Sequence, residues 1–259
     1  MNGENLQMLM VEADTGPAVP IAYRFDKPQT GKPAFVWFCG FRSEMESLKA
    51  SALAAWAKAN GAGCLRFDYS GHGKSSGRFE DGTIGAWLAQ ATAVCAHALQ
   101  GTPAVFVGSS MGGWIALLLA RQWSSRKASH LKGIALIAPA WDMTRLFWER
   151  ATPEIRETIL RDGVYLRPSA YDDGPYPITR ALFEDGERHF LGGGPLALSV
   201  PIRIVHGCQD SDIPWRHSLA LLEAAGCPDM RLTLVKDGEH RLSRPQDLSL
   251  LFSMLREFL

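Results

Sequence analysis

The sequence has no excess charge of either sign. Its 259 residues contain 27 Lys and Arg side chains and 27 Asp and Glu side chains. A chain with balanced charge creates no overall electrostatic field that would attract nucleic acid or an anionic membrane surface. We therefore expect no nucleic-acid partner.

The chain has only five cysteines, and no two of them form a C-x-x-C pair. An odd number of thiols without such spacing argues against a disulfide framework and against a structural zinc site. No basic residue precedes Arg24, whereas Glu4, Glu12 and Asp14 do. This pattern is unlike a secretory or mitochondrial leader. We predict a cytoplasmic protein that binds no metal and no cofactor.

The sequence also lacks an apolar run of the roughly 20 residues needed to cross a bilayer. No stable membrane insertion is therefore expected. The hydrophobic fraction of 46% and the charged fraction of 21% are ordinary for a globular protein. A chain of this length can bury one large core, so we predict a single domain over residues 1–259. The sequence leaves the oligomeric state open.

Short apolar runs alternate with helical patterns along most of the chain. The runs typical of buried strands cover residues 34–39, 62–69, 103–108, 131–138, 200–207 and 230–235. Helical patterns cover residues 45–59, 83–100, 111–123, 215–225 and 246–259. Two further strands, 6–11 and 19–25, form a hairpin that leads into this series. The order predicts an α/β fold, with a mostly parallel central sheet and helices on both faces.

Residues 140–199 depart from this alternation. They are rich in aromatic residues and arginine and are interrupted by proline and glycine. We interpret them as a helical cap inserted over the site. Trp141, Phe147 and Trp148 are candidates for substrate binding, because aromatic side chains suit an apolar acyl chain.

The most informative stretch is the pentapeptide GSSMG at residues 108–112, between a predicted strand and a predicted helix. A G-x-S-x-G sequence in this context is typical of a nucleophile on a sharp strand-to-helix turn. Gly108 and Gly112 would let the strand and the helix approach closely. Ser110 is therefore the candidate nucleophile.

A serine nucleophile needs a histidine base, and the histidine needs a carboxylate partner. His240 is the candidate base because it follows the last predicted strand and precedes the last helix. Asp210 follows the preceding strand and is the first choice of acid, with Asp212 second and Asp142 third. Since the carboxyl ends of parallel strands meet at one edge of a sheet, these groups are expected to lie together.

The oxyanion formed during acyl transfer requires two backbone N–H donors. The residue after the nucleophile, Met111, supplies the first. The second is expected in the loop after the strand at 34–39. Phe41 is the candidate there, within one residue, because Gly40 before it allows the backbone to turn inward.

These motifs together resemble the α/β-hydrolase superfamily and, within it, the α/β-hydrolase domain-containing protein 10 group of serine esterases. The resemblance rests on RFDYSG at 66–71, VGSSMGGW at 107–114, LRPSAY at 166–171 and PIRIVHG at 201–207. It implies a triad of Ser110, Asp210 and His240 acting on carboxylic esters or thioesters; that group hydrolyses acyl glucuronides and palmitoyl thioesters. The turn at residues 39–43 departs from the group, reading CGFRS in place of a Pro-Gly-Tyr-like turn.

Two other functions remain open from the sequence. The same triad could hydrolyse carbon–carbon or amide bonds, and the same fold could serve as a non-catalytic binding protein. The first hypothesis remains a serine acyl hydrolase with a small-molecule or acylated substrate.

Overall fold

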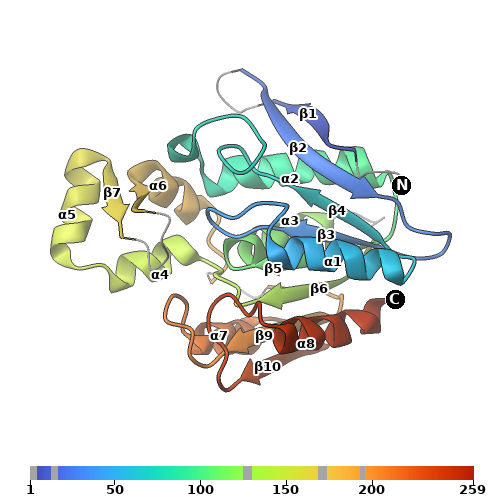
Figure 1. The fold of residues 1–259 in the computed structure, drawn as a ribbon. Helices are drawn as coiled ribbons and strands as arrows, with labels where there is room; N and C mark the ends of the chain where they lie inside the picture. The colour runs from blue at the N-terminus through green and yellow to red at the C-terminus, as the bar shows by residue number, and fades with distance from the viewer. Residues whose placement is uncertain (1–4, 13–16, 125–129, 169–173, 193–195) are drawn as a thin grey trace.

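The computed structural model describes residues 5–12, 17–124, 130–168, 174–192 and 196–259. Its main sheet contains eight strands, namely β1 (Gln7–Val11), β2 (Val19–Asp26), β3 (Ala34–Phe38), β4 (Gly63–Phe67), β5 (Ala104–Ser109), β6 (Leu131–Ile137), β9 (Ile202–Gly207) and β10 (Met230–Val235). Their order is β1-β2-β4-β3-β5-β6-β9-β10 (Figure 1). Strand β2 is antiparallel to β1 and β4, and the other neighbours are parallel. The predicted α/β architecture is confirmed.

Helices α1 (Leu48–Ala59), α2 (Ile84–Leu99), α3 (Met111–Ser124) and α7 (Trp215–Ala224) each lie between two of these strands in the sequence. Helix α8 (Pro245–Leu255) follows β10. Helices α1 and α8 lie together, as do α2 and α3, so that helices cover both faces of the sheet (Figure 1). The rings of Trp56 and Phe252 stack between α1 and α8 with centroids 5.3 Å apart. Among the helices of the described ranges, none is long and apolar enough to span a membrane.

Helix α1 begins three residues later than the sequence pattern predicted. The N–H of Met45 donates to the carboxylate of Asp68 at 2.6 Å, and the N–H of Ser47 donates to the Glu44 carbonyl at 3.1 Å. These bonds hold the backbone before Leu48 in a turn. A long-range bond to Asp68 could not be read from the helical pattern.

The segment between β6 and β9 contains α4 (Met143–Arg150), α5 (Pro153–Asp162), β7 (Val164–Arg167), β8 (Tyr176–Thr179) and α6 (Arg180–Arg188). Helices α4, α5 and α6 agree with the helical character expected of this segment. Strands β7 and β8 also pair there as an antiparallel ribbon, which the sequence did not predict. Each strand has only four residues and β8 contains Pro177, so neither gives a clear strand pattern. Part of the LRPSAY motif, residues 169–171, lies outside the described residues. The division into one domain with a cap over residues 140–199 remains a prediction.

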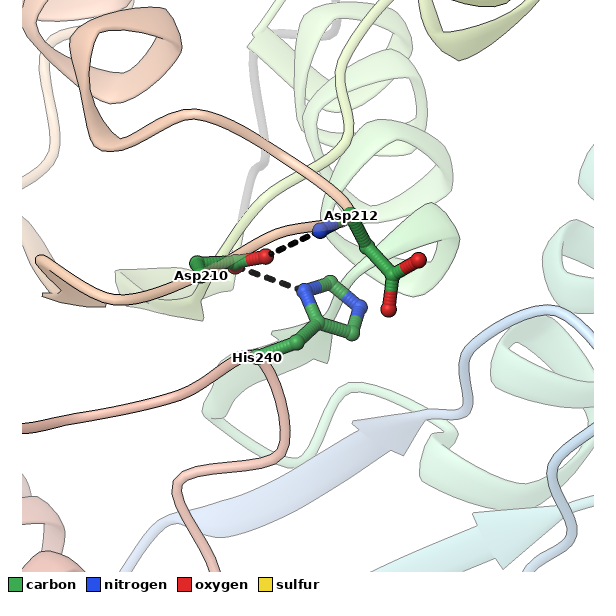
Figure 2. A group of neighbouring side chains, drawn as sticks. All are labelled: Asp210, Asp212 and His240. Carbon is green, nitrogen blue, oxygen red and sulfur yellow. Dashed lines mark hydrogen bonds and ion pairs between the residues drawn. The ribbon is translucent and has the colours of Figure 1, made fainter. Parts of the chain in front are cut away.

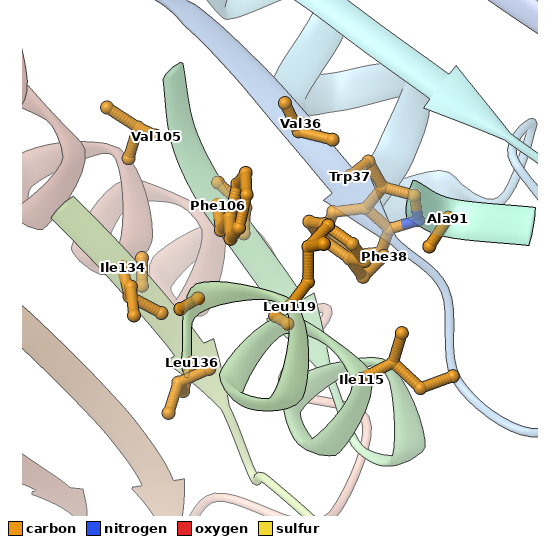
Figure 3. Packing of buried hydrophobic residues seen from close by; sticks show 14 of the residues in the cluster. Val36, Trp37, Phe38, Ala91, Val105, Phe106, Ile115, Leu119, Ile134 and Leu136 are labelled. Atoms are coloured by element: carbon orange, nitrogen blue, oxygen red, sulfur yellow. The ribbon is translucent and has the colours of Figure 1, made fainter. Parts of the chain in front are cut away.

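The core beneath the site is built from large apolar side chains of the central strands and α3 (Figure 3). Phe38 of β3 meets Phe67 and Phe106 edge to face, with ring centroids 5.7 and 5.0 Å apart. All three side chains are fully buried. Burial of one such side chain stabilises a fold by about 1.5–3 kcal/mol. The carboxyl ends of β3 and β5 are therefore anchored in well-packed structure.

Candidate active site

Ser110 lies at the junction between β5 and α3 with a left-handed backbone, φ 53°. This conformation costs a non-glycine residue about 1–3 kcal/mol. Hydrogen bonds to the next strand and its loop hold it in place. The Ser110 N–H donates to the Ile137 carbonyl at 2.9 Å, and the Ser110 carbonyl accepts the Ala140 N–H at 3.0 Å. The turn thus has the strained geometry predicted for a nucleophile.

The glycines on either side of this turn are required by close packing. A Cβ atom at Gly108 would lie 2.6 Å from the Gly112 carbonyl oxygen. A Cβ atom at Gly112 would lie 2.6 Å from the Cys39 carbonyl oxygen and would also overlap the Phe38 carbonyl. The close approach expected from the G-x-S-x-G pattern is present, and it joins the start of α3 to the end of β3.

The side chains of Ser110, His240 and Asp210 form a continuous hydrogen-bonded chain. Nε2 of His240 lies 3.1 Å from Oγ of Ser110, and Nδ1 of His240 lies 2.7 Å from Oδ2 of Asp210 (Figure 2). Because Asp210 can only accept when ionised, Nδ1 donates to it and Nε2 is left to accept from the serine hydroxyl. Three groups from the ends of three different strands thus have the order nucleophile, base and acid.

The carboxyl group of Asp210 is inaccessible to solvent. Burial by itself would raise the pKa of Asp210, but hydrogen bonds from His206 and His240 outweigh it and lower the pKa to about 2. The other oxygen, Oδ1, accepts the backbone N–H groups of Asp212 and Ile213 at 2.9 and 2.8 Å. Asp210 is consequently a fixed and ionised partner for His240.

The two other candidate acids are directed elsewhere. The backbone N–H of Asp212 is bonded to Asp210, while its carboxylate points away from Asp210 (Figure 2) and pairs with Arg167 at 3.3 Å. It does not cap α7, whose N-cap residue is Pro214. The carboxylate of Asp142 accepts the N–H groups of Leu191 and Gly192 at 2.8 and 2.9 Å in the cap segment.

Asp210, Asp212 and His240 each offer one possible metal-ligand atom, and these atoms lie within 4.8 Å of one another. The hydrogen bond between Asp210 and His240 already accounts for part of this proximity. We therefore interpret the group as the acid and base of a triad. The absence of a metal and a cofactor stays a prediction.

The turn after β3 lies against the nucleophile. A Cβ atom at Gly40 would lie 3.3 Å from Cβ of Ser110. The N–H of Arg42 donates to Nε2 of His72 at 3.2 Å. Within the described ranges, the backbone N–H groups of Phe41 and Met111 have no hydrogen-bond acceptor. Both are therefore available for an oxyanion, whereas the N–H of Arg42 is occupied.

A cavity of about 1050 Å³ opens above Ser110 and His240, between the sheet and the cap segment. Phe147 lines it, but Trp141 and Trp148 do not belong to its lining. Trp141 stacks on His217 with ring centroids 4.7 Å apart and donates its Nε1–H to the His217 carbonyl at 2.9 Å. Trp148 packs edge to face on Phe183. Of the three aromatic residues expected at the substrate, the structure brings only Phe147 to the cavity.

Lys49 was missed by the sequence reasoning. It extends from α1 and donates through Nζ to the Arg241 carbonyl at 2.6 Å and to Oγ of Ser243 at 3.3 Å. Desolvation lowers the pKa of Lys49 to about 8. The ammonium group thereby holds the loop that carries His240. No local pattern connects residue 49 with residue 241, because the contact depends on how α1 packs near α8.

Comparison with known proteins finds relatives that cover most of this chain. A curated relative named palmitoyl-protein thioesterase ABHD10, mitochondrial, from Pongo abelii is 32% identical over 237 residues, which cover 91% of this chain and 75% of that protein. A solved structure described as a putative hydrolase from Agrobacterium vitis S4 is 39% identical, covers 98% of both chains and has a TM-score of 0.93. Mouse alpha/beta hydrolase domain-containing protein 10 is 29% identical, with a TM-score of 0.86 over 98% of this chain and 97% of that one.

These relatives confirm the resemblance inferred from the motifs. The curated relative is named as mitochondrial, so it gives no support to the expected cytoplasmic location, which stays a prediction. The model of the alpha/beta hydrolase family matches residues 33–249, which include Ser110, Asp210 and His240. The chain belongs to the alpha/beta hydrolase family and is a hydrolase.

Proposed function

We propose that this protein is a serine acyl hydrolase that cleaves carboxylic esters or thioesters through an acyl-enzyme on Ser110. The observation that carries the proposal is the pair of hydrogen bonds on opposite nitrogens of His240, at 3.1 Å to Ser110 and 2.7 Å to Asp210. This arrangement lets one imidazole remove the serine proton while the carboxylate stabilises the imidazolium that forms.

In the first half of the reaction, Oγ of Ser110 bonds to the acyl carbon as its proton moves to Nε2 of His240. The tetrahedral intermediate then collapses, and the alcohol or thiol leaves with that proton. In the second half, water bonds to the acyl carbon as one of its protons moves to Nε2 of His240. The bond between Oγ of Ser110 and the acyl carbon then breaks, Oγ takes that proton back, and the carboxylic acid leaves. Asp210 stays ionised throughout.

The negative charge of each tetrahedral intermediate would be held by the N–H groups of Phe41 and Met111. The packing of the turn after β3 on Ser110 supports this assignment, since it puts both peptides next to the nucleophile. The N–H of Arg42 already donates to His72, which supports Phe41 rather than Arg42 as the donor to the oxyanion. The amino terminus of α3 adds a positive dipole end at the same place.

The substrate would occupy the cavity between the sheet and the cap. Its volume of about 1050 Å³ and the aromatic ring of Phe147 suit an acyl group together with part of the leaving group. The curated relatives are named palmitoyl-protein thioesterases, which favours a thioester among the possible bonds. We therefore infer an acylated substrate, either a small molecule or an acyl group carried by a larger partner.

The test is hydrolysis of p-nitrophenyl esters and acyl thioesters of increasing chain length, together with labelling by a fluorophosphonate probe. Ser110→Ala should lose labelling and lower kcat by about 10⁴- to 10⁶-fold. Ser109→Ala makes the same chemical change one residue earlier and should keep the label. A preferred acyl length would measure the usable depth of the cavity.

The other outcomes identify the competing functions. Labelling without ester or thioester hydrolysis would favour cleavage of amide or carbon–carbon bonds by the same triad. No labelling and no hydrolysis by the wild type would favour a binding protein. Wild-type turnover by Ser110→Ala would overturn the assignment of the nucleophile.

A further inference from the structure

A second histidine contacts the triad acid. His206 is at the end of β9 and has no solvent exposure. Its Nε2 lies 3.1 Å from Oδ2 of Asp210, the same oxygen that His240 contacts, and 2.9 Å from the Ile213 carbonyl oxygen. Its Nδ1 lies 2.7 Å from Oγ of Ser218 on α7. One carboxylate oxygen is thus shared by two imidazole rings.

The chemistry of these neighbours fixes the direction of each hydrogen bond. A carbonyl oxygen and an ionised carboxylate can only accept, so Nε2 of His206 carries a proton and donates to both. In the neutral ring Nδ1 then accepts from the Ser218 hydroxyl. The hydrogen bonds therefore run from Ser218 through His206 to Asp210, which also accepts from His240.

We propose that His206 is a positioning residue for the reaction at Ser110, because its Nε2–H holds Oδ2 of Asp210 in line with Nδ1 of His240. The inference rests on the proposed serine hydrolase function. His206 does not touch the reacting atoms and acts through the orientation and charge of Asp210. Without this donor, Oδ2 would keep only the His240 Nδ1–H, while Oδ1 would still accept the N–H groups of Asp212 and Ile213. The carboxylate would thus lose one of its four hydrogen bonds, on the oxygen that faces His240.

Charged groups from several elements lie around the pair. Arg150 of α4 donates to the Asp212 and Ser211 carbonyl oxygens at 2.6 and 3.4 Å, and Lys49 of α1 donates to the Arg241 carbonyl next to His240 at 2.6 Å. Asp210 faces His206 and His240, and the Asp212 carboxylate beside them is paired with Arg167. His217 on α7 also lies near His206, but it is bonded to the Trp141 carbonyl. Removal of the His206 donor leaves the negative charge of Asp210 stabilised by one hydrogen bond fewer, so the carboxylate attracts the His240 ring more strongly and favours its imidazolium form. The acid limb of the pH profile of kcat/KM should therefore move to higher pH.

The test compares His206→Leu, which removes the donor, with His206→Gln, whose amide N–H can occupy the position of Nε2–H. Loss of the hydrogen-bond partner of a metal ligand typically costs about 10- to 100-fold in affinity or activity, and we take the same magnitude for the hydrogen-bond partner of Asp210. We expect His206→Leu to lower kcat by about that factor with little change in KM and to move the acid limb upward. His206→Gln should keep most of the wild-type kcat, and the acid limb of its kcat/KM profile should lie at the wild-type pH. His217→Gln makes the same change at a neighbouring histidine that does not contact Asp210, and it should leave both unchanged.

A structural role alone would give a different result. If His206 served only to hold the loop after β9 against α7, His206→Leu would lower the free energy of unfolding. The folded fraction would keep the wild-type kcat and pH profile, and that result would refute the proposal. If the Leu variant does not fold, Ser218→Ala takes its place. That variant removes the donor to Nδ1 and should move the acid limb in the same direction by a smaller amount; an unmoved limb there overturns the proposal.

Failure of the proposed function is recognised separately, in the wild type. Absence of fluorophosphonate labelling on Ser110 of the wild type would remove the reaction that His206 is proposed to support and would overturn both inferences. Labelling and turnover by the wild type, combined with an unchanged kcat and pH profile in His206→Leu, would overturn only the role of His206.

Discussion

Substitution of Gly112 by alanine tests whether the turn at Ser110 and the turn after β3 are aligned by direct backbone packing. The added Cβ would lie 2.6 Å from the Cys39 carbonyl oxygen, against 3.4 Å for the onset of ordinary van der Waals contact, and would overlap the Phe38 carbonyl still more. These atoms are backbone, so no side-chain rotation relieves the overlap. The start of α3 and the end of β3 must separate by about 0.8 Å or more at the Cys39 contact.

This separation would move the Met111 N–H away from the Phe41 N–H. A displacement of about 1 Å in a catalytic arrangement can cost about 100-fold in rate. We expect Gly112→Ala to lower kcat by about that factor while KM changes little, because the cavity wall formed by the cap is untouched. Overpacking of the core should also lower the free energy of unfolding by about 1–3 kcal/mol.

Gly31→Ala is the matched control. Gly31 has φ 83° and no atom within 4 Å of its would-be Cβ, so alanine there costs only backbone strain of about 1–2 kcal/mol. Gly31 lies before the first residue of β3, whereas the candidate site lies after the last residue of that strand. Urea denaturation and steady-state kinetics on both variants separate stability from alignment. A folded Gly112→Ala variant with kcat within about twofold of wild type would refute the reasoning.

Two further predictions concern His72 and the cavity. Burial lowers the pKa of His72 to about 4, so between pH 6.5 and 4 the unfolded chain takes up a proton that the folded protein does not. His72 should therefore contribute a fall of roughly 3 kcal/mol to the free energy of unfolding over this window. In urea denaturation, His72→Asn should be less sensitive to pH than the wild type by about this amount; an equal pH dependence of the two proteins would contradict the prediction. Phe147→Ala should raise KM for long-chain esters several-fold and leave acetyl esters nearly unchanged, whereas Trp148→Ala, outside the cavity lining, should not show this chain-length dependence.

The sequence was sufficient to predict the sheet and the sharp turn at Ser110, because both depend on local patterns. Buried strands are continuously apolar, so they can be recognised one at a time. The two glycines of the G-x-S-x-G pattern predict that the flanking strand and helix approach closely, even when the atoms they contact are not known. The β7–β8 ribbon was not predictable in this way, because its two short strands are defined by pairing with each other across residues 168–175. Composition also could not tell that Trp141 turns toward His217 rather than the cavity.

The choice between Asp210 and Asp212 as the acid could have been made from the sequence of their loop. Asp210 and Asp212 are two residues apart in one loop, and periodicity does not separate them. What separates them is that Oδ1 of Asp210 accepts the N–H groups of the second and third residues after it, a turn that aspartate favours. That turn leaves Oδ2 facing His240 and directs the Asp212 carboxylate toward Arg167. The turn therefore does two things at once: it satisfies the backbone of the loop, and it leaves one carboxylate oxygen free for the histidines.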